Sequence, residues 1–183
     1  LLRGGGDFPA GLGAGKMGRP MPAEAHRGSG EIIKEGGVTP LWWIIKDGDE
    51  VCKELYERHY SRRRYKDGRT VKLFCGPGEK IVLRTWEGDA LFVWRKFIDG
   101  SGQQGVNCAV FRNESSHQSS ELIRQADAIA DFCWPCERHY TYVNASKIKS
   151  SNPGYCFKLA GWTTRGRTKG GLVVLEKGGQ HNG

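Results

Sequence analysis

The sequence lacks any apolar run approaching the roughly 20 residues that a membrane-spanning helix requires. It also lacks a segment with the basic start and apolar middle of a signal peptide. We therefore expect a cytoplasmic protein without a membrane partner. The 183 residues suffice for one domain with a substantial core, which the six Trp, six Tyr and seven Phe can fill.

Cysteine occurs six times, mostly singly among apolar or aromatic neighbours, as reduced and buried thiols do. A disulfide framework is typical of smaller secreted chains. Cys133 and Cys136, followed by His139, have the spacing of half a zinc site, but a second pair of ligands is missing. A thioredoxin-like role would need a strand before the pair, and none is predicted. We expect no metal site.

The Gly- and Pro-rich start contains one aromatic residue, Phe8, and no helix or strand period. A phosphate loop at 11–18 is excluded because no strand precedes it and no Gly-Lys-Ser/Thr follows it. We predict a disordered or non-native leader over 1–37, one domain over 38–177 and a loose tail over 178–183.

Acidic residues are outnumbered, with 20 Asp and Glu against 28 Lys and Arg, which gives a net charge of +8. Basic proteins tend to bind nucleic acid, acidic membranes or small anions. The cations are densest in 58–69, where Tyr60 and Tyr65 lie among them, as expected for phosphate binding with base stacking. A solvated charged face is the alternative. The predicted nucleic-acid-binding residues are Arg62, Arg63, Arg64, Lys66 and Arg69.

The hydrophobic pattern predicts strands alternating with helices in the second half of the chain. The expected elements are a strand at 41–47, a helix capped by Asp47 and Glu50, two or three strands within 72–97, a strand at 106–114, a helix at 119–132 capped by Ser119 or Ser120, a strand at 140–143, a helix near 153–160 and a hairpin within 163–177. We expect an α/β fold with a single mixed, mostly antiparallel sheet, parallel near its middle, and helices on both faces.

The segment 138–162 carries the most local detail. Asn152 is a predicted N-cap, and Pro153 occupies the first helical position, where its missing N–H costs nothing. Gly161 stands where a left-handed C-cap residue is needed, and Trp162 is expected to pack back on the last turn.

This element order resembles the GCN5-related N-acetyltransferase (GNAT) superfamily over roughly 41–177. VNCAVFRNE (106–114) is similar to its central strand, SSELIRQADAIADF (119–132) to the following helix, and KLAGW (158–162) to its C-terminal signature. The resemblance implies a GNAT-like acyl-CoA N-acyltransferase fold, acetyl-CoA or another acyl-CoA as cofactor, and an amine acceptor, here an anionic one such as DNA or RNA.

Two positions depart from the family. Its Arg/Gln-x-x-Gly-x-Gly/Ala loop, which holds the coenzyme A pyrophosphate, is replaced by the glycine-free segment 112–120. Phe157 stands where the family often has a tyrosine as general acid. A narrower similarity is to the Mom-type phage DNA-modification proteins, which look like acetyltransferases, modify adenine in DNA and also lack the usual loop.

The candidate site residues follow from these positions. Glu114 is the predicted base, acting directly or through water, and Tyr155 is the predicted general acid, with Asn144 beside them at the end of a strand. The predicted cofactor-binding residues are Arg112, Asn113, Ser115, Ser119, Ser120 and Asn152. Each also has a structural interpretation, as a turn, a cap or a complement to a helix dipole. The alternative function is a catalytically inactive GNAT-like module that binds nucleic acid.

Overall fold

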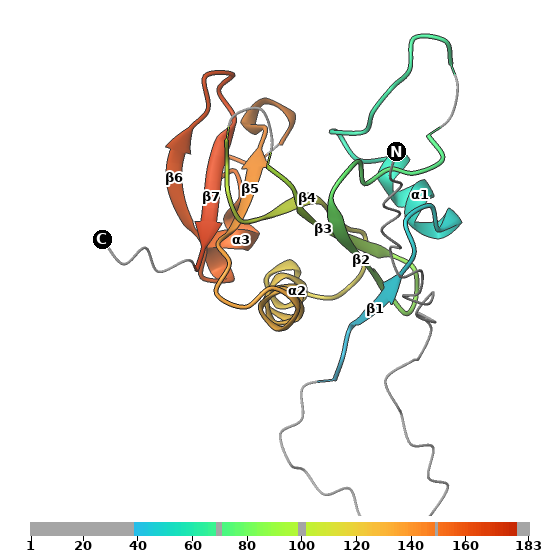
Figure 1. The fold of residues 1–183 in the computed structure, drawn as a ribbon, viewed down its shortest axis with the longest axis horizontal. Helices are drawn as coiled ribbons and strands as arrows, with labels where there is room; N and C mark the ends of the chain where they lie inside the picture. Colours follow the sequence, from blue (N-terminus) through green and yellow to red (C-terminus); the bar gives the residue numbers. More distant parts are fainter. Residues whose placement is uncertain (1–38, 69–70, 99–101, 149, 179–183) are drawn as a thin grey trace, which may run out of the picture. The chain divides into compact units, whose positions relative to one another are not determined.

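Seven strands form one sheet in the order β1-β2-β3-β4-β5-β7-β6 in the computed structural model, which describes residues 39–68, 71–98, 102–148 and 150–178 (Figure 1). The elements are β1 Trp42–Ile45, α1 Glu50–Glu57, β2 Glu79–Thr85, β3 Ala90–Lys96, β4 Val106–Asn113, α2 Ser119–Cys133, β5 His139–Val143, η1 Ala145–Lys147, α3 Tyr155–Leu159, β6 Thr163–Arg167 and β7 Val173–Lys177. The leader predicted over 1–37 and the tail beyond residue 178 lie outside the described residues.

The pairing of the strands confirms the predicted α/β class with one mixed, mostly antiparallel sheet. Each pair of neighbouring strands is antiparallel except β4 and β5, which run parallel in the middle of the sheet. Two strands, β2 and β3, form within 72–97, which is the lower of the two predicted numbers. No helix among the described residues has the length and apolar character needed to cross a bilayer.

Strand β3 contributes to two separate clusters of buried side chains. Ala90, Phe92 and Trp94 belong to the first cluster, which also contains side chains of α2 and α3. Leu91 and Val93 belong to the second cluster, with the α1 side chains Cys52, Leu55 and Tyr56. Because successive side chains of a strand point to opposite faces, both faces of β3 are buried. This explains why residues 90–94 form a continuous apolar run in the sequence.

The start of α1 corrects one prediction. Asp49, not Asp47, is the N-cap, and its carboxylate accepts a hydrogen bond from the Cys52 N–H at 3.0 Å. The Asp47 carboxylate instead accepts from the Phe74 N–H at 3.0 Å and lies 3.4 Å from the Lys80 ammonium. A partner 27 residues away along the chain therefore decides the role of Asp47.

The predicted N-caps of α2 and α3 were also wrong, although α2 begins at the predicted residue, Ser119. Gln118 is the residue before α2, so Ser119 and Ser120 lie inside the helix. The N-cap of α3 is Gly154, in the left-handed region at φ 74°, so Asn152 and Pro153 precede the helix. The Asn152 side-chain oxygen accepts a hydrogen bond from the Lys158 ammonium at 2.6 Å, and this contact replaces the predicted cap.

The end of α3 confirms the prediction. Gly161 has φ 91°, and its N–H donates to the Lys158 carbonyl, while the Trp162 N–H donates to the Phe157 carbonyl, both at 3.0 Å. These two bonds make a Schellman motif. The Trp162 ring packs on Phe157, with ring centroids 4.9 Å apart.

Candidate functional site

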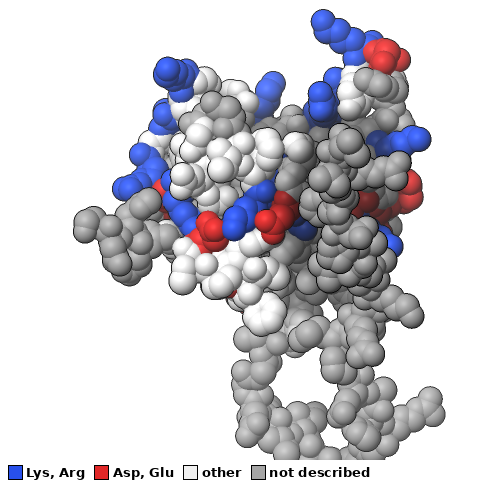
Figure 2. Space-filling model, in the orientation of Figure 1, with Lys and Arg blue, Asp and Glu red and all other residues white. Residues whose placement is uncertain are grey.

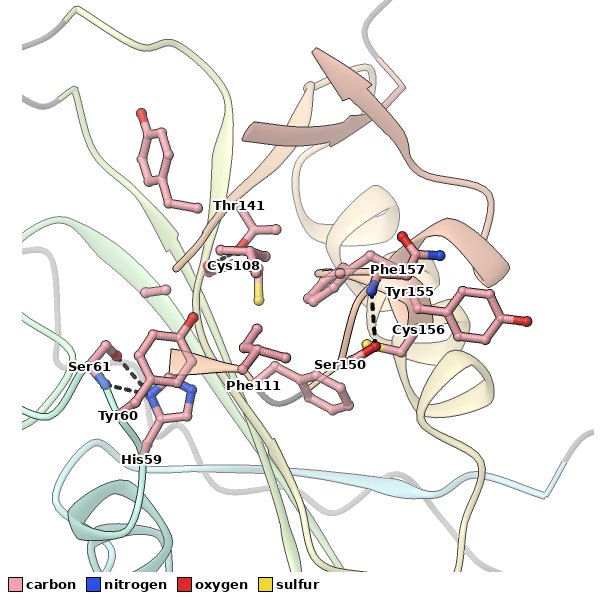
Figure 3. Close-up of a pocket in the computed structure, with 16 residues that line it drawn as sticks. His59, Tyr60, Ser61, Cys108, Phe111, Thr141, Ser150, Tyr155, Cys156 and Phe157 are labelled. Atoms are coloured by element: carbon pink, nitrogen blue, oxygen red, sulfur yellow. Dashed lines mark hydrogen bonds between the residues drawn. The ribbon is translucent and has the colours of Figure 1, made fainter. Parts of the chain in front are cut away.

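A pocket of about 390 Å³ lies where β4 and β5 separate (Figure 3). The parallel ladder pairs only Val106 with His139, Asn107 with Tyr140 and Cys108 with Thr141, although β4 continues to Asn113 and β5 to Val143. The end of the sheet at which β4 reaches Asn113 and β5 reaches Val143 is called the pocket end below. The lining comes from the turn after α1 (His59, Tyr60, Ser61), from β4 (Cys108, Ala109, Phe111), from β5 (Thr141, Tyr142, Val143) and from residues before and within α3 (Ile148, Ser150, Asn152, Gly154, Tyr155, Cys156, Phe157).

The wall of the pocket formed by β4 and β5 carries no charged side chain. The Thr141 hydroxyl donates to the Cys108 carbonyl at 2.9 Å, next to the last pair of the ladder. Burial raises the pKa of the Cys108 thiol well above its usual range, and burial also raises the pKa of Cys156. Both thiols are therefore protonated at neutral pH, and neither is an activated nucleophile.

His59 and Ser61 form a hydrogen-bonded pair on the opposite wall. The Ser61 hydroxyl lies 2.7 Å from His59 Nδ1, and the Ser61 N–H donates to the same nitrogen at 3.2 Å. A nitrogen that accepts a backbone N–H carries no proton, so Nδ1 is the basic nitrogen of a neutral ring. Burial, and next the charge of Arg112, lower the pKa of His59 to about 4. This imidazole is therefore uncharged at neutral pH, with the lone pair of Nδ1 directed at Ser61.

Tyr60 connects this turn to the end of β5. Its ring lies over the His59 imidazole, with centroids 4.4 Å apart. Burial raises the pKa of Tyr60, and a hydrogen bond from the backbone of Asn144 partly offsets that rise. The phenol is thus neutral and held at the pocket, which suits a proton donor.

The predicted base, Glu114, is held by two arginines outside the pocket lining. Its carboxylate accepts from Arg58 Nε at 2.9 Å and Nη2 at 2.8 Å, and also from Arg112 Nε. Hydrogen bonding from Arg58, followed by that from Arg112, lowers the pKa of Glu114 to about 2. A carboxylate with this pKa is a weak proton acceptor at neutral pH.

The other two predicted catalytic residues have different surroundings. Asn144 does not line the pocket, and its amide oxygen accepts from the Ser146 N–H at 3.1 Å and hydroxyl at 2.8 Å. Tyr155 lines the pocket rim, but the residue is 53% exposed. Figure 3 shows its ring pointing away from Cys108 and Thr141.

The predicted cofactor loop, 112–120, is folded around the Asn113 side chain. The Asn113 amide donates to the His117 carbonyl at 2.8 Å and to the Ser119 hydroxyl at 2.9 Å, and its oxygen accepts from the Ser115 N–H and hydroxyl. Ser120 is buried, and no side chain caps the first turn of the 15-residue helix α2. The loop leads into an uncapped helix N-terminus and does not line the pocket.

The predicted phosphate-binding residues differ in their contacts and in their exposure. Arg62 forms an ion pair with Glu57 at 2.7 Å, and the Arg63 guanidinium lies over the Tyr65 ring, 5.1 Å from its centroid. Arg63, Arg64 and Lys66 are exposed. Arg69 lies outside the described residues. These three exposed cations follow the turn His59–Ser61, which lines the pocket.

The sequence analysis missed His59 and Ser61 because it treated 58–69 as one basic stretch. The available signal was a His-Tyr-Ser run directly after a helix that ends at Glu57. The described residues contain no group of three or more metal-ligating side chains, and Cys133 and Cys136 are exposed free thiols. A scan against protein-family models and searches of curated proteins and of solved structures give no match to this chain.

Proposed function

We propose that this protein has a GNAT-like fold and transfers an acyl group from an acyl-CoA to an amine on a nucleic acid. The observation that carries the proposal is the parallel β4–β5 pair, whose ladder stops after three residue pairs and opens on the pocket. The packing of α1 with Leu91 and Val93, and of α2 and α3 with Phe92 and Trp94, supports helices on both faces of the sheet.

Two features of the chain fit an acyl-CoA. Beyond Cys108, the side of β4 that faces β5 forms no ladder with it among the described residues. Backbone N–H groups on this side would bind the acyl carbonyl. The uncapped N-terminus of α2 fits a pyrophosphate, since the helix dipole and its first N–H groups favour anions. The cofactor would supply an acyl thioester. The amine nitrogen would form a C–N bond to the acyl carbon as the C–S bond breaks and the thiolate leaves.

The residues that line the pocket would then handle the protons. His59 Nδ1 accepts the proton of the attacking amine, directly or through the Ser61 hydroxyl 2.7 Å away. Tyr60 donates its proton to the departing thiolate, the role first expected of Tyr155. This assignment moves the base from Glu114 to His59, because His59 lines the pocket, whereas Glu114 lies outside the lining and is held by Arg58 and Arg112.

Calorimetry with acetyl-CoA tests the cofactor, and mass spectrometry of nucleosides from cells that express the chain tests the product. We expect binding by the wild type and a modified nucleoside. His59→Gln and Tyr60→Phe should keep the affinity for acetyl-CoA and lose at least tenfold in product formation. A folded sample that binds no acetyl-CoA would refute the cofactor, and full activity of both variants would refute the roles given to these side chains.

The second candidate is a catalytically inactive GNAT-like module that binds nucleic acid. The exposed side chains of Arg63, Arg64 and Lys66 favour this candidate, since such cations bind phosphates whether or not the protein is a catalyst. It predicts salt-dependent binding of DNA or RNA that survives Glu114→Ala and Tyr155→Phe. That binding should be lost when Arg62, Arg63 and Arg64 are all changed to Ala, and no modified nucleoside should form.

A further inference from the structure

The hairpin of β6 and β7 carries exposed cations that the sequence analysis did not assign. All five residues of β6 are exposed, and β6 is an edge strand of the sheet. Arg165 forms an ion pair with Glu176 at 2.7 Å. Arg167 donates only to the Gly171 carbonyl, and no carboxylate pairs with it or with Lys169 among the residues that the structure describes. The tip of this hairpin therefore carries two uncompensated positive charges.

Strand pairing places this tip at the pocket end of the sheet. Val143, the last residue of β5, pairs with Val173, the first residue of β7, so the turn between β6 and β7 lies beside the end of β5. The stretch after α1 reaches the same place, because Tyr60 bonds to the backbone of Asn144. Lys147, exposed in η1, lies three residues further along.

The two basic segments therefore share one end of the sheet. In Figure 1 the β6–β7 tip and the loop after α1 both lie at the upper side of the view. Figure 2 shows Lys and Arg side chains on both upper flanks of the surface. The pocket lies between the segments, since residues of β5 and of the His59–Ser61 turn line it.

We propose that the β6–β7 tip is a second phosphate-binding arm, and that a nucleic acid chain crosses the pocket mouth from Arg63, Arg64 and Lys66 to Arg167 and Lys169. The inference rests on the proposed function and specifies how its acceptor is held. A single small anion would need one compact group of cations, whereas a phosphodiester chain places charges at regular intervals along its length. Tyr60 and Tyr155 at the pocket provide aromatic rings on which bases stack.

The test is fluorescence anisotropy of the full chain with labelled single-stranded and duplex DNA over a series of KCl concentrations. Three double variants are compared: Arg167→Ala with Lys169→Ala, Arg63→Ala with Arg64→Ala, and the control Lys46→Ala with Lys72→Ala. The control lysines are exposed and lie beside the carboxyl end of β1, where Ile45 pairs with Val82. Through Val82 and Val93, Ile45 is in register with Val110, so β1 runs away from the Asn113 end of β4 towards these lysines.

We expect the hairpin variant to bind roughly tenfold more weakly at low salt, with a slope of log K against log [KCl] reduced by about 1.8 for duplex and about 1.4 for single strands. The Arg63/Arg64 variant should lose a similar amount, and the control should bind as the wild type does. If the hairpin variant matches the control while the Arg63/Arg64 variant is weakened, the second arm is refuted and the proposed function stands. If the wild type binds neither DNA, both the arm and the nucleic acid acceptor are refuted, while acyl transfer to other amines is still measurable.

Discussion

Asp127 is the one buried acidic residue among those that the structure describes. It is buried in α2, accepts from the Trp162 indole N–H at 3.0 Å and from the Lys177 ammonium at 2.8 Å, and lies 3.4 Å from His139 Nδ1. A buried charge is tolerated only when it is paired and hydrogen-bonded, so this cluster depends on all its members. It also links α2 to Trp162, the residue before β6, and to the end of β7.

We predict that Asp127→Asn lowers the free energy of unfolding by about 2 kcal/mol, because the Lys177 ammonium, one-third exposed, loses its charged partner and keeps only the Ala160 carbonyl. Urea denaturation followed by circular dichroism measures the change. The matched control is Asp131→Asn, one helical turn later, whose side chain is 64% exposed; it should cost under about 1 kcal/mol. Equal effects of the two variants would contradict the importance given to burial.

Glu114 should stabilise the fold in a pH-dependent way. Its pKa is lowered from 4.5 to about 2 in the folded chain, so the unfolded chain binds the proton more readily. The stabilisation is therefore fully present above about pH 4.5 and is lost as the pH falls through about 2. Since the carboxylate is one-third exposed, we expect Glu114→Gln to cost only about 1 kcal/mol at pH 7.

Urea unfolding of the wild type and of Glu114→Gln at pH 7, 5, 4 and 3 checks this prediction. The difference in free energy of unfolding should be constant from pH 7 to 5 and should shrink at pH 4 and 3. A difference that grows on acidification would contradict the ion pair with Arg58 as its source.

At the scale of the elements, the helix ends show which features the sequence could predict. Gly161 and Trp162 were predicted correctly because a Schellman motif is made by neighbouring residues alone. The N-caps were predicted less well, since Asp47 and Asn152 each have the right side chain but are used by Phe74 and Lys158 instead. The partner of Asp47 is 27 residues away and leaves no local signal, whereas the partner of Asn152 is six residues away, within α3.

Position 154, the N-cap of α3, requires glycine for two reasons, backbone conformation and space. Its φ of 74° is unfavourable for other residues, and an added Cβ would overlap the Leu175 side chain. We predict that Gly154→Ala lowers the free energy of unfolding by about 2 to 4 kcal/mol, from backbone strain and overpacking together. Thermal or urea unfolding provides the measurement.

The matched control is Gly171→Ala, because Gly171 has φ 81° but nothing within 4 Å of its added Cβ. It should cost only the backbone part, about 1 to 2 kcal/mol. Equal losses for the two variants would mean that the contact with Leu175 relaxes freely.

At the scale of the whole molecule, the sheet consists of two parts, β1-β2-β3-β4 and β5-β7-β6, joined by a three-pair parallel ladder. The sequence predicted the parallel pair from the alternation of strands and helices, but it could not indicate where the pairing stops. The pocket arises at that point, and His59 reaches it from a turn 49 residues before Cys108 in the sequence. Sites assembled from such distant segments have no periodic signal in one sequence.

Side chains of the first cluster must hold the two parts together where the backbone does not. Trp162 has the central position: its ring stacks on Trp94 of β3, with centroids 6.2 Å apart, and contacts His139 of β5 at 6.3 Å. Its indole N–H also donates to Asp127 of α2. One buried side chain thus contacts both parts of the sheet and the helix that connects them.

We predict that Trp162→Ala lowers the free energy of unfolding by about 3 to 5 kcal/mol, since it removes a large buried ring and a partner of Asp127. Because the lost contacts join the two parts, amide hydrogen exchange should accelerate more in β5, β6 and β7 than in β2 and β3, whose mutual ladder is longer. The matched control, Trp86→Ala, removes a ring from a residue that is 67% exposed and should cost under about 1 kcal/mol. Uniform acceleration across both parts would show that they unfold as a single unit, and the three-pair ladder would then not be the weak point of the sheet.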